Sequence, residues 1–189
     1  PMFITGFVCI SMLQMKKGIW MIPIIIYTAS FLSALFFRPF FLNKKDRSLL
    51  QSEKPQFKPT RSKFSLSLFD DCIVSSCSVL LKVGVYIIIF SIIAAFLNRI
   101  HISFEIGRVL LIGFVELTNG INFLGLSDLT QATKIVLACT LMGFGGLSIT
   151  AQTSSVIANR GLSTFKYLLC KLVNALLAFI LSLFIFFLL

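Results

Sequence analysis

Charged residues are scarce in this chain, and acidic ones are scarcer still. Asp, Glu, Lys and Arg together make up 13% of the 189 residues, with 17 basic residues against seven acidic ones. Hydrophobic residues make up 57%, more than the roughly 45–50% of ordinary globular proteins. A soluble domain of this length cannot bury so much apolar surface. Composition alone therefore indicates a protein that folds within a lipid bilayer.

The residues that commonly carry enzyme chemistry are equally rare. The chain has one histidine, His101, so its spacing to Glu105 cannot be completed to a two-histidine zinc motif. The five cysteines form no CxxC pair, and we interpret them as small buried hydrophobes rather than as a disulfide or metal framework. No P-loop and no Ser-His-Asp arrangement is evident. We therefore expect no enzyme activity, no cofactor and no metal site.

Apolar runs separated by short polar stretches predict several transmembrane helices. About 20 apolar residues cross the roughly 30 Å hydrocarbon core, and backbone groups in lipid must be satisfied within a helix. We expect the end of one helix in residues 1–15, a span over 19–37, and a last span over 167–189. Between them, an amphipathic start at the membrane surface from Phe64 continues into a span that ends at Leu97. The predicted class is all-α, a polytopic transmembrane helical bundle.

One connector holds nearly half of the basic residues. Eight of the 17 lie between residues 38 and 63, namely Arg38, Lys44, Lys45, Arg47, Lys54, Lys58, Arg61 and Lys63. The positive-inside bias predicts that this connector is a cytoplasmic linker, and not a nucleic-acid-binding surface. The chain then divides into residues 1–37 (a helix end and one span), the linker 38–63, and a membrane domain 64–189. Because Pro1 opens within an apolar run, we expect this chain to be part of a longer one.

Residues 109–126 do not read as a simple span. Seven apolar residues up to Val115 are followed by Glu116-Leu-Thr-Asn-Gly120, and the apolar sequence then resumes. A polar tip between apolar arms predicts a re-entrant hairpin, in which irregular backbone is shielded by protein or faces a water-filled cavity. The alternative, a full crossing, would place Arg160, Lys166 and Lys171 outside and so fits the positive-inside bias less well.

A second interruption follows at Gly143, Gly145 and Gly146. These glycines predict a helix that is broken within the bilayer and resumes as a polar half-helix over residues 147–158. The amino terminus of a half-helix carries a partial positive charge and spare N–H groups, which suit an anion, and many transporters hold substrate at such ends. Close helix packing is the competing explanation. The six residues 113–118 (GFVELT) and 143–148 (GFGGLS) echo each other, which indicates paired broken elements.

Polar groups at the two interruptions are the candidate solute- or ion-binding residues. A carboxylate at membrane depth is costly unless it is paired, hydrated or protonated, so Glu116 is a functional hypothesis. The alternatives for Glu116 are a structural ion pair with Lys134 or Arg108, or a position at the membrane interface. The full set contains the hairpin tip and the broken helix: Glu116, Thr118, Asn119, Gly120, Asn122, Gly143, Gly145, Gly146, Ser148, Thr150 and Gln152.

Two of these runs resemble a known family. Glu116-Leu-Thr-Asn-Gly-Ile-Asn122, followed by Leu141-Met-Gly-Phe-Gly-Gly-Leu-Ser-Ile-Thr-Ala-Gln152, resembles the second half of the YlbJ-type sporulation integral membrane proteins, which belong to the nucleoside-recognition or gate domain group. The resemblance covers residues 64–189. It implies two related halves, each with a re-entrant hairpin and a broken helix, that move a small metabolite across the outer forespore membrane of an endospore-forming bacterium. Dipicolinate, an anion, is the candidate solute.

The resemblance also implies partners. The family's first half is missing from this chain, so we expect a missing N-terminal repeat of the same protein to complete the site. The other expected partners are the lipid bilayer, a small anionic solute and a second copy of the chain in a homo-oligomer. The cell membrane is the alternative location. The alternative function is a non-transporting structural membrane protein of the spore envelope, in which the same features only pack helices.

Overall fold

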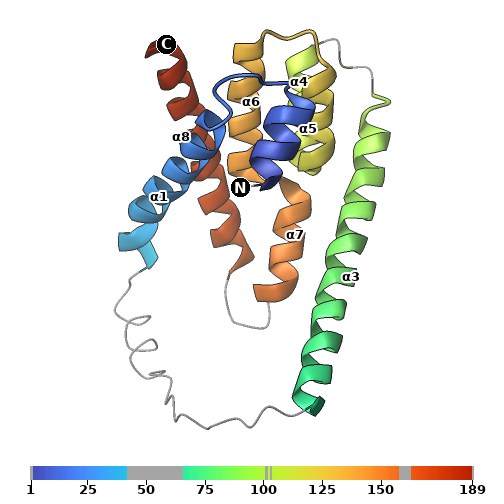
Figure 1. Ribbon diagram of the computed structural model, residues 1–189. Helices are drawn as coiled ribbons and strands as arrows, with labels where there is room; N and C mark the ends of the chain where they lie inside the picture. The colour runs from blue at the N-terminus through green and yellow to red at the C-terminus, as the bar shows by residue number, and fades with distance from the viewer. Residues whose placement is uncertain (1, 42–65, 101, 103, 158–162, 189) are drawn as a thin grey trace.

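The computed structural model describes residues 2–41, 66–100, 102, 104–157 and 163–188, and every regular element within them is a helix (Figure 1). The all-α prediction is therefore confirmed. In chain order, the elements are the π-helix η1 (Phe3–Met12) and the α-helices α1 (Met21–Phe41), α3 (Leu66–Leu97), α4 (Glu105–Val115), α5 (Leu117–Leu126), α6 (Gln131–Phe144), α7 (Gly146–Ile157) and α8 (Thr164–Leu188).

Four stretches of the described chain are long and apolar enough to cross a membrane. They are Met21–Pro39, Leu66–Leu97, Gln131–Ser155 and Thr164–Ile185. The third joins α6 and α7. In its most apolar 18-residue stretch, 61% is buried inside the protein, whereas in the corresponding stretch of α3 only 6% is buried. α6 and α7 thus form the centre of the bundle, while α3 exposes apolar side chains that a bilayer would cover. The chain is a multi-pass membrane protein by these criteria.

The hairpin predicted for residues 109–126 is present and re-entrant. α4 descends from the end of the bundle at which α3 arrives, the chain turns at Glu116, and α5 returns beside α4 to the same end (Figure 1). α6 then descends next to the hairpin and is interrupted at the level of the hairpin tip, and α7 continues in the same general direction. Both predicted irregularities therefore exist, and they lie at the same depth.

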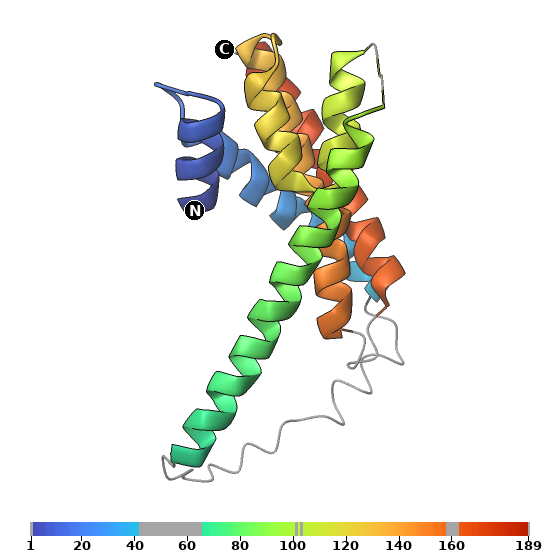
Figure 2. The same ribbon diagram turned by 90° about the vertical axis from the view of Figure 1, so that its right-hand side faces the viewer.

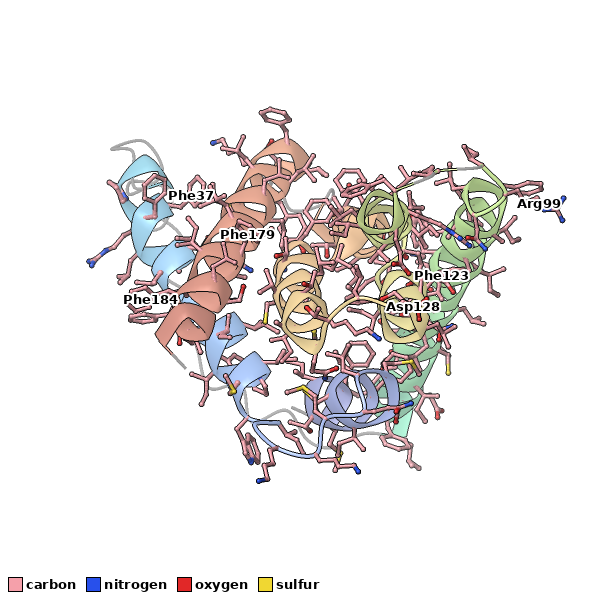
Figure 3. The ribbon with its side chains drawn as sticks, turned by 90° about the horizontal axis from the view of Figure 1, so that it is seen from above. Phe37, Arg99, Phe123, Asp128, Phe179 and Phe184 are labelled. Carbon is pink, nitrogen blue, oxygen red and sulfur yellow. The ribbon has the colours of Figure 1, made fainter. Side chains whose placement is uncertain are left out.

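Two clusters of buried hydrophobic side chains hold the bundle together. The main core joins η1, α1, α5, α6 and α8 through fully buried side chains such as Val8, Ile22, Ile121 and Ala138. A smaller cluster of Ala94, Ile112 and Val115 joins α3 to α4. Seen down the bundle, α8 and α3 lie on opposite sides of the hairpin and α6 (Figure 3). The hairpin is thus wedged between α3 and the α6–α8 pair.

α3 is one continuous helix, as the uninterrupted run from Phe64 to Leu97 predicted. Its 32 residues correspond to about 48 Å of helix, and they run without interruption through the stretch that the sequence suggested would lie at the membrane surface. Its first half extends away from the other helices (Figure 2). There, apolar and polar side chains alike, such as Val74 and Ser75, are exposed. The amphipathic start predicted for this stretch is thus part of the same helix as the span, and its location at the membrane surface stays a prediction.

The boundary of the first span also differs from the prediction. α1 begins at Met21 and continues through Arg38 and Pro39 to Phe41, although the linker was expected to begin at Arg38. Proline near a helix end removes only one hydrogen bond, so the helix does not have to stop before it. The rest of the predicted linker, 42–63, lies outside the described residues, as do His101 and Arg160. The cytoplasmic location of the linker stays a prediction.

Candidate functional site

The first helix break is the single residue Glu116. Its backbone is extended (φ −139°, ψ 116°), and its side chain is only 4% exposed. One carboxylate oxygen accepts a hydrogen bond from the Thr118 amide at 3.1 Å, and the other accepts from the Asn119 amide at 2.6 Å. Glu116 is therefore the N-cap of α5. Its charge lies where unpaired N–H groups and the helix dipole favour an anion.

The ion-pair alternative for Glu116 is wrong. The Lys134 ammonium donates to the Gly125 carbonyl at 2.8 Å, which satisfies an acceptor near the end of α5. The Arg108 guanidinium donates twice to Asn98 Oδ1, at 2.9 and 2.6 Å, and lies over the ring of Phe123. Both basic groups are therefore engaged away from the hairpin tip, one near the end of α5 and the other with Asn98, just after α3. The buried charge of Glu116 is stabilised by backbone amides instead.

Of the other predicted tip residues, two make contacts between helices and two are exposed. A Cβ on Gly120 would overlap Gly113 Cα, so the absence of a side chain is what lets α4 and α5 touch. The Asn119 side chain donates to Ser91 Oγ on α3 at 3.1 Å and ties the tip to that helix. Thr118 and Asn122 are exposed on the hairpin surface. Only Glu116 and Gly120 of this group are buried at the tip.

The second helix break consists of Gly145 and Gly146. Their φ angles are +87° and +83°, in the left-handed region that glycine adopts at little cost. The Gly145 amide donates to the Leu141 carbonyl at 2.7 Å and ends α6. The helix restarts at once as α7. Two consecutive glycines in this conformation are thus the local reason why the span is interrupted.

The two breaks are in direct contact. A Cβ built on Gly146 would lie 3.2 Å from the Leu117 amide nitrogen, 3.4 Å from the Gly113 carbonyl oxygen and 3.6 Å from that of Phe114. The rings of Phe114 and Phe144, which hold equivalent places in the six-residue echo, stack at 4.7 Å. The amino terminus of α7 therefore adjoins the last carbonyls of α4 and the first amide of α5. Four helix ends converge here.

Polar residues of α7 are satisfied mainly within that helix. Ser148 is 1% exposed and accepts from the Gln152 amide at 3.1 Å, and the buried Thr150 hydroxyl donates to the Gly146 carbonyl at 3.1 Å. Gln152 is half-buried. Ser148 and Gln152 thus share one face of α7, while Thr150 lies on the other side of the helix and bonds back to its first turn.

Sequence reasoning missed Asn174, which lies on α8. Its side chain is 7% exposed, and Nδ2 donates to the Gly143 carbonyl at 2.9 Å, at the end of α6. Its Oδ1 atom is buried without a hydrogen-bond partner. Buried acceptors are nearly always paired, so Oδ1 is an available ligand group beside the break. An amide in an otherwise Leu- and Phe-rich span was the signal that could have found it.

Gly143 has a different role from the other two glycines. It keeps helical geometry, and a Cβ there would come within 3.0 Å of Ala175 Cα and 3.1 Å of Ala178 Cβ. Small residues permit such close helix contact in membranes. Gly143 thus brings α6 against α8 and places the Asn174 amide at the break.

Comparison of the chain with family models, with curated proteins and with solved structures gives no match. The candidate site is therefore defined by its own geometry: a capped hairpin tip and a glycine break that meet inside a helical membrane protein.

Proposed function

We propose that this chain is half of a gate-type membrane transporter, and that a small anionic metabolite binds where the hairpin tip meets the α6–α7 break. The observation that carries the proposal is the contact of Gly146 with the Leu117 amide and the Gly113 carbonyl. Two interrupted helices meeting at one depth have no simple packing advantage, because each break gives up intrahelical hydrogen bonds. In transporters, such paired half-helices bind substrate.

The polar groups at the junction favour an anion that also bears a hydrogen-bond donor. The amino terminus of α7 contributes N–H groups and a partial positive charge. Asn174 Oδ1, which has no partner, is an acceptor for a ligand donor or for a cation bound with the solute. Exposed Thr118 and Asn122 remain available to groups outside the described chain. The junction thus offers N–H donors together with an unpaired acceptor, and this combination favours a solute that has both an anionic group and a hydrogen-bond donor.

The finer proposal follows from the family resemblance. The resemblance to YlbJ-type proteins implies that the solute is dipicolinate and that it is transported during sporulation. The proposed location is the outer forespore membrane, with the cell membrane as the alternative. A second, N-terminal repeat would contribute its own hairpin and broken helix, and the chain would work with that repeat or in a homo-oligomer. The single hairpin and single broken helix of the described residues are consistent with one such repeat.

A structural membrane protein is the second candidate, and specific contacts favour it. Glu116, Ser148 and Thr150 all have hydrogen-bond partners within the described chain, and Gly120 and Gly143 serve close helix contacts. A protein that only packs helices would also show these features. The two functions differ in whether the junction opens to a solute.

Uptake of labelled dipicolinate into proteoliposomes tests the proposal, with the protein produced from its complete gene. We expect saturable uptake that Gly146→Val abolishes, because the branched side chain would press on the Leu117 amide and the α4 carbonyls. Gly84→Val is the matched control, since a Cβ on Gly84 has nothing within 4 Å. Uptake no greater than that of empty liposomes would favour the structural role.

A further inference from the structure

We propose that a pocket beneath the η1–α1 turn binds one anionic phospholipid, with its phosphate at Lys16 and Lys17 and an acyl chain in the apolar interior. The pocket has a volume of about 400 Å³, within the range of roughly 300–1,000 Å³ typical of small-molecule sites. It lies away from the junction of the two breaks, so this proposal does not depend on the proposed function.

The lining of the pocket is basic in one part and mainly apolar in the rest. Its exposed part, the mouth, contains Lys16 and Lys17 of the turn. Its less exposed part, the floor, contains apolar side chains of three helices, including Ile25 of α1, Ile135 of α6 and Ile185 of α8. Ser182 also lines the floor, but its hydroxyl already donates to the Phe179 carbonyl at 2.7 Å. A molecule that fits must be anionic at one end and apolar at the other.

The charge at the mouth is available. The Lys16 and Lys17 side chains are exposed, and in the part of the chain that the structure describes neither ammonium forms a hydrogen bond or an ion pair. The turn itself is held in place, because the Gln131 amide donates to the Leu13 carbonyl at 2.9 Å and Gly18 adopts a φ of +70°. Two unpaired cations are thus presented on a fixed backbone.

The position along the bundle matches the membrane interface. The pocket lies where the candidate spans of α1 and α6 begin, at Met21 and Gln131, and where that of α8 ends, at Ile185. Trp20, next to the turn, is 68% exposed, as expected for an aromatic residue at the level of the headgroups. Basic side chains at a membrane surface attract anionic headgroups. A free phosphate ion would fill the mouth and leave the apolar floor empty.

Trp20 is the only tryptophan of the chain, so its fluorescence reports directly on lipids at this turn. The test reconstitutes the protein in phosphatidylcholine liposomes, which contain no other tryptophan, and measures quenching of Trp20 by brominated phosphatidylglycerol and by brominated phosphatidylcholine. Each basic residue near a membrane surface contributes roughly fivefold to anionic lipid binding. We therefore expect a preference for phosphatidylglycerol of up to about 25-fold, which Lys16→Ala with Lys17→Ala removes.

The matched control is Lys82→Ala with Arg99→Ala, which removes the same charge from α3 and from the turn that follows it; Arg99 lies at the periphery of the bundle (Figure 3). This variant should keep the preference. Equal quenching by the two lipids would overturn the proposal, and so would an equal loss in the control, which would mean general attraction to the protein's net charge. Inorganic phosphate that abolishes the preference at millimolar concentration would assign the site to a free anion and overturn the lipid assignment.

Discussion

The rings of Phe114 and Phe144 stack nearly parallel, with centroids 4.7 Å apart and an angle of 6° between their planes. Each residue lies just before a helix break, one in the hairpin and one in the interrupted span. The stack therefore fixes the two breaks against each other, and it links two sequence segments that are 30 residues apart.

Glu116→Ala should destabilise the protein by about 1 kcal/mol, the usual cost of losing an N-cap. Both carboxylate oxygens accept backbone amides of α5, and alanine offers neither. Glu116→Gln should lose less, because its carbonyl oxygen still accepts one amide. Chemical unfolding in detergent measures both values. An alanine variant as stable as the wild type would contradict the capping role.

Gly120→Ala should force α4 and α5 apart, because its Cβ would overlap Gly113 Cα and backbone cannot move aside cheaply. Overpacking of this kind costs about 1–3 kcal/mol, and the yield of folded protein should fall. Gly84→Ala introduces the same methyl group on α3 with nothing within 4 Å. It should be neutral or slightly stabilising because alanine favours helix. Thermal unfolding of the two variants side by side gives the comparison, and equal midpoints would argue against the close contact.

Asn174→Leu should destabilise the protein, because the buried Gly143 carbonyl at the end of α6 would lose its donor. A buried polar group without a partner costs about 1–3 kcal/mol. Ser182→Ala, on the same helix, removes a hydroxyl bonded only within its own turn and should cost less. If a solute or cation binds at Asn174 Oδ1, its addition should raise the unfolding midpoint of the wild type but not of Asn174→Leu. A larger loss for the serine variant would exclude the role of Asn174 at the break.

Cysteine labelling on a cysteine-free background tests the orientation in the membrane. Ser52→Cys, in the basic linker, should resist an impermeant thiol reagent in intact cells, because the positive-inside bias places it in the cytoplasm. Asp128→Cys is the matched probe, since Asp128 is exposed at the open end of the hairpin (Figure 3), away from the end at which α3 begins. It should label readily. The reverse pattern would invert the topology.

The sequence alone determined the features that depend on neighbouring residues. Apolar runs fixed the helices and the membrane environment, the polar tip at Glu116 fixed the hairpin, and Gly145 with Gly146 fixed the broken helix. These features follow from interactions over a few residues, such as i to i+4 hydrogen bonds and the left-handed conformation that glycine permits. The predictions of helix ends were less accurate. α1, for example, continues beyond Arg38, because a single proline near a terminus does not decide where a helix stops.

Only the tertiary structure decided which of these features meet. In the folded chain, Gly146 lies against Leu117. Lys134 donates to the Gly125 carbonyl and not to Glu116, and Asn174 donates to the Gly143 carbonyl. No local pattern encodes such pairs, because they depend on how α4, α6 and α8 pack through small residues far apart in the chain. The sequence therefore specified the breaks, and the packing of glycine against backbone specified that they form one junction.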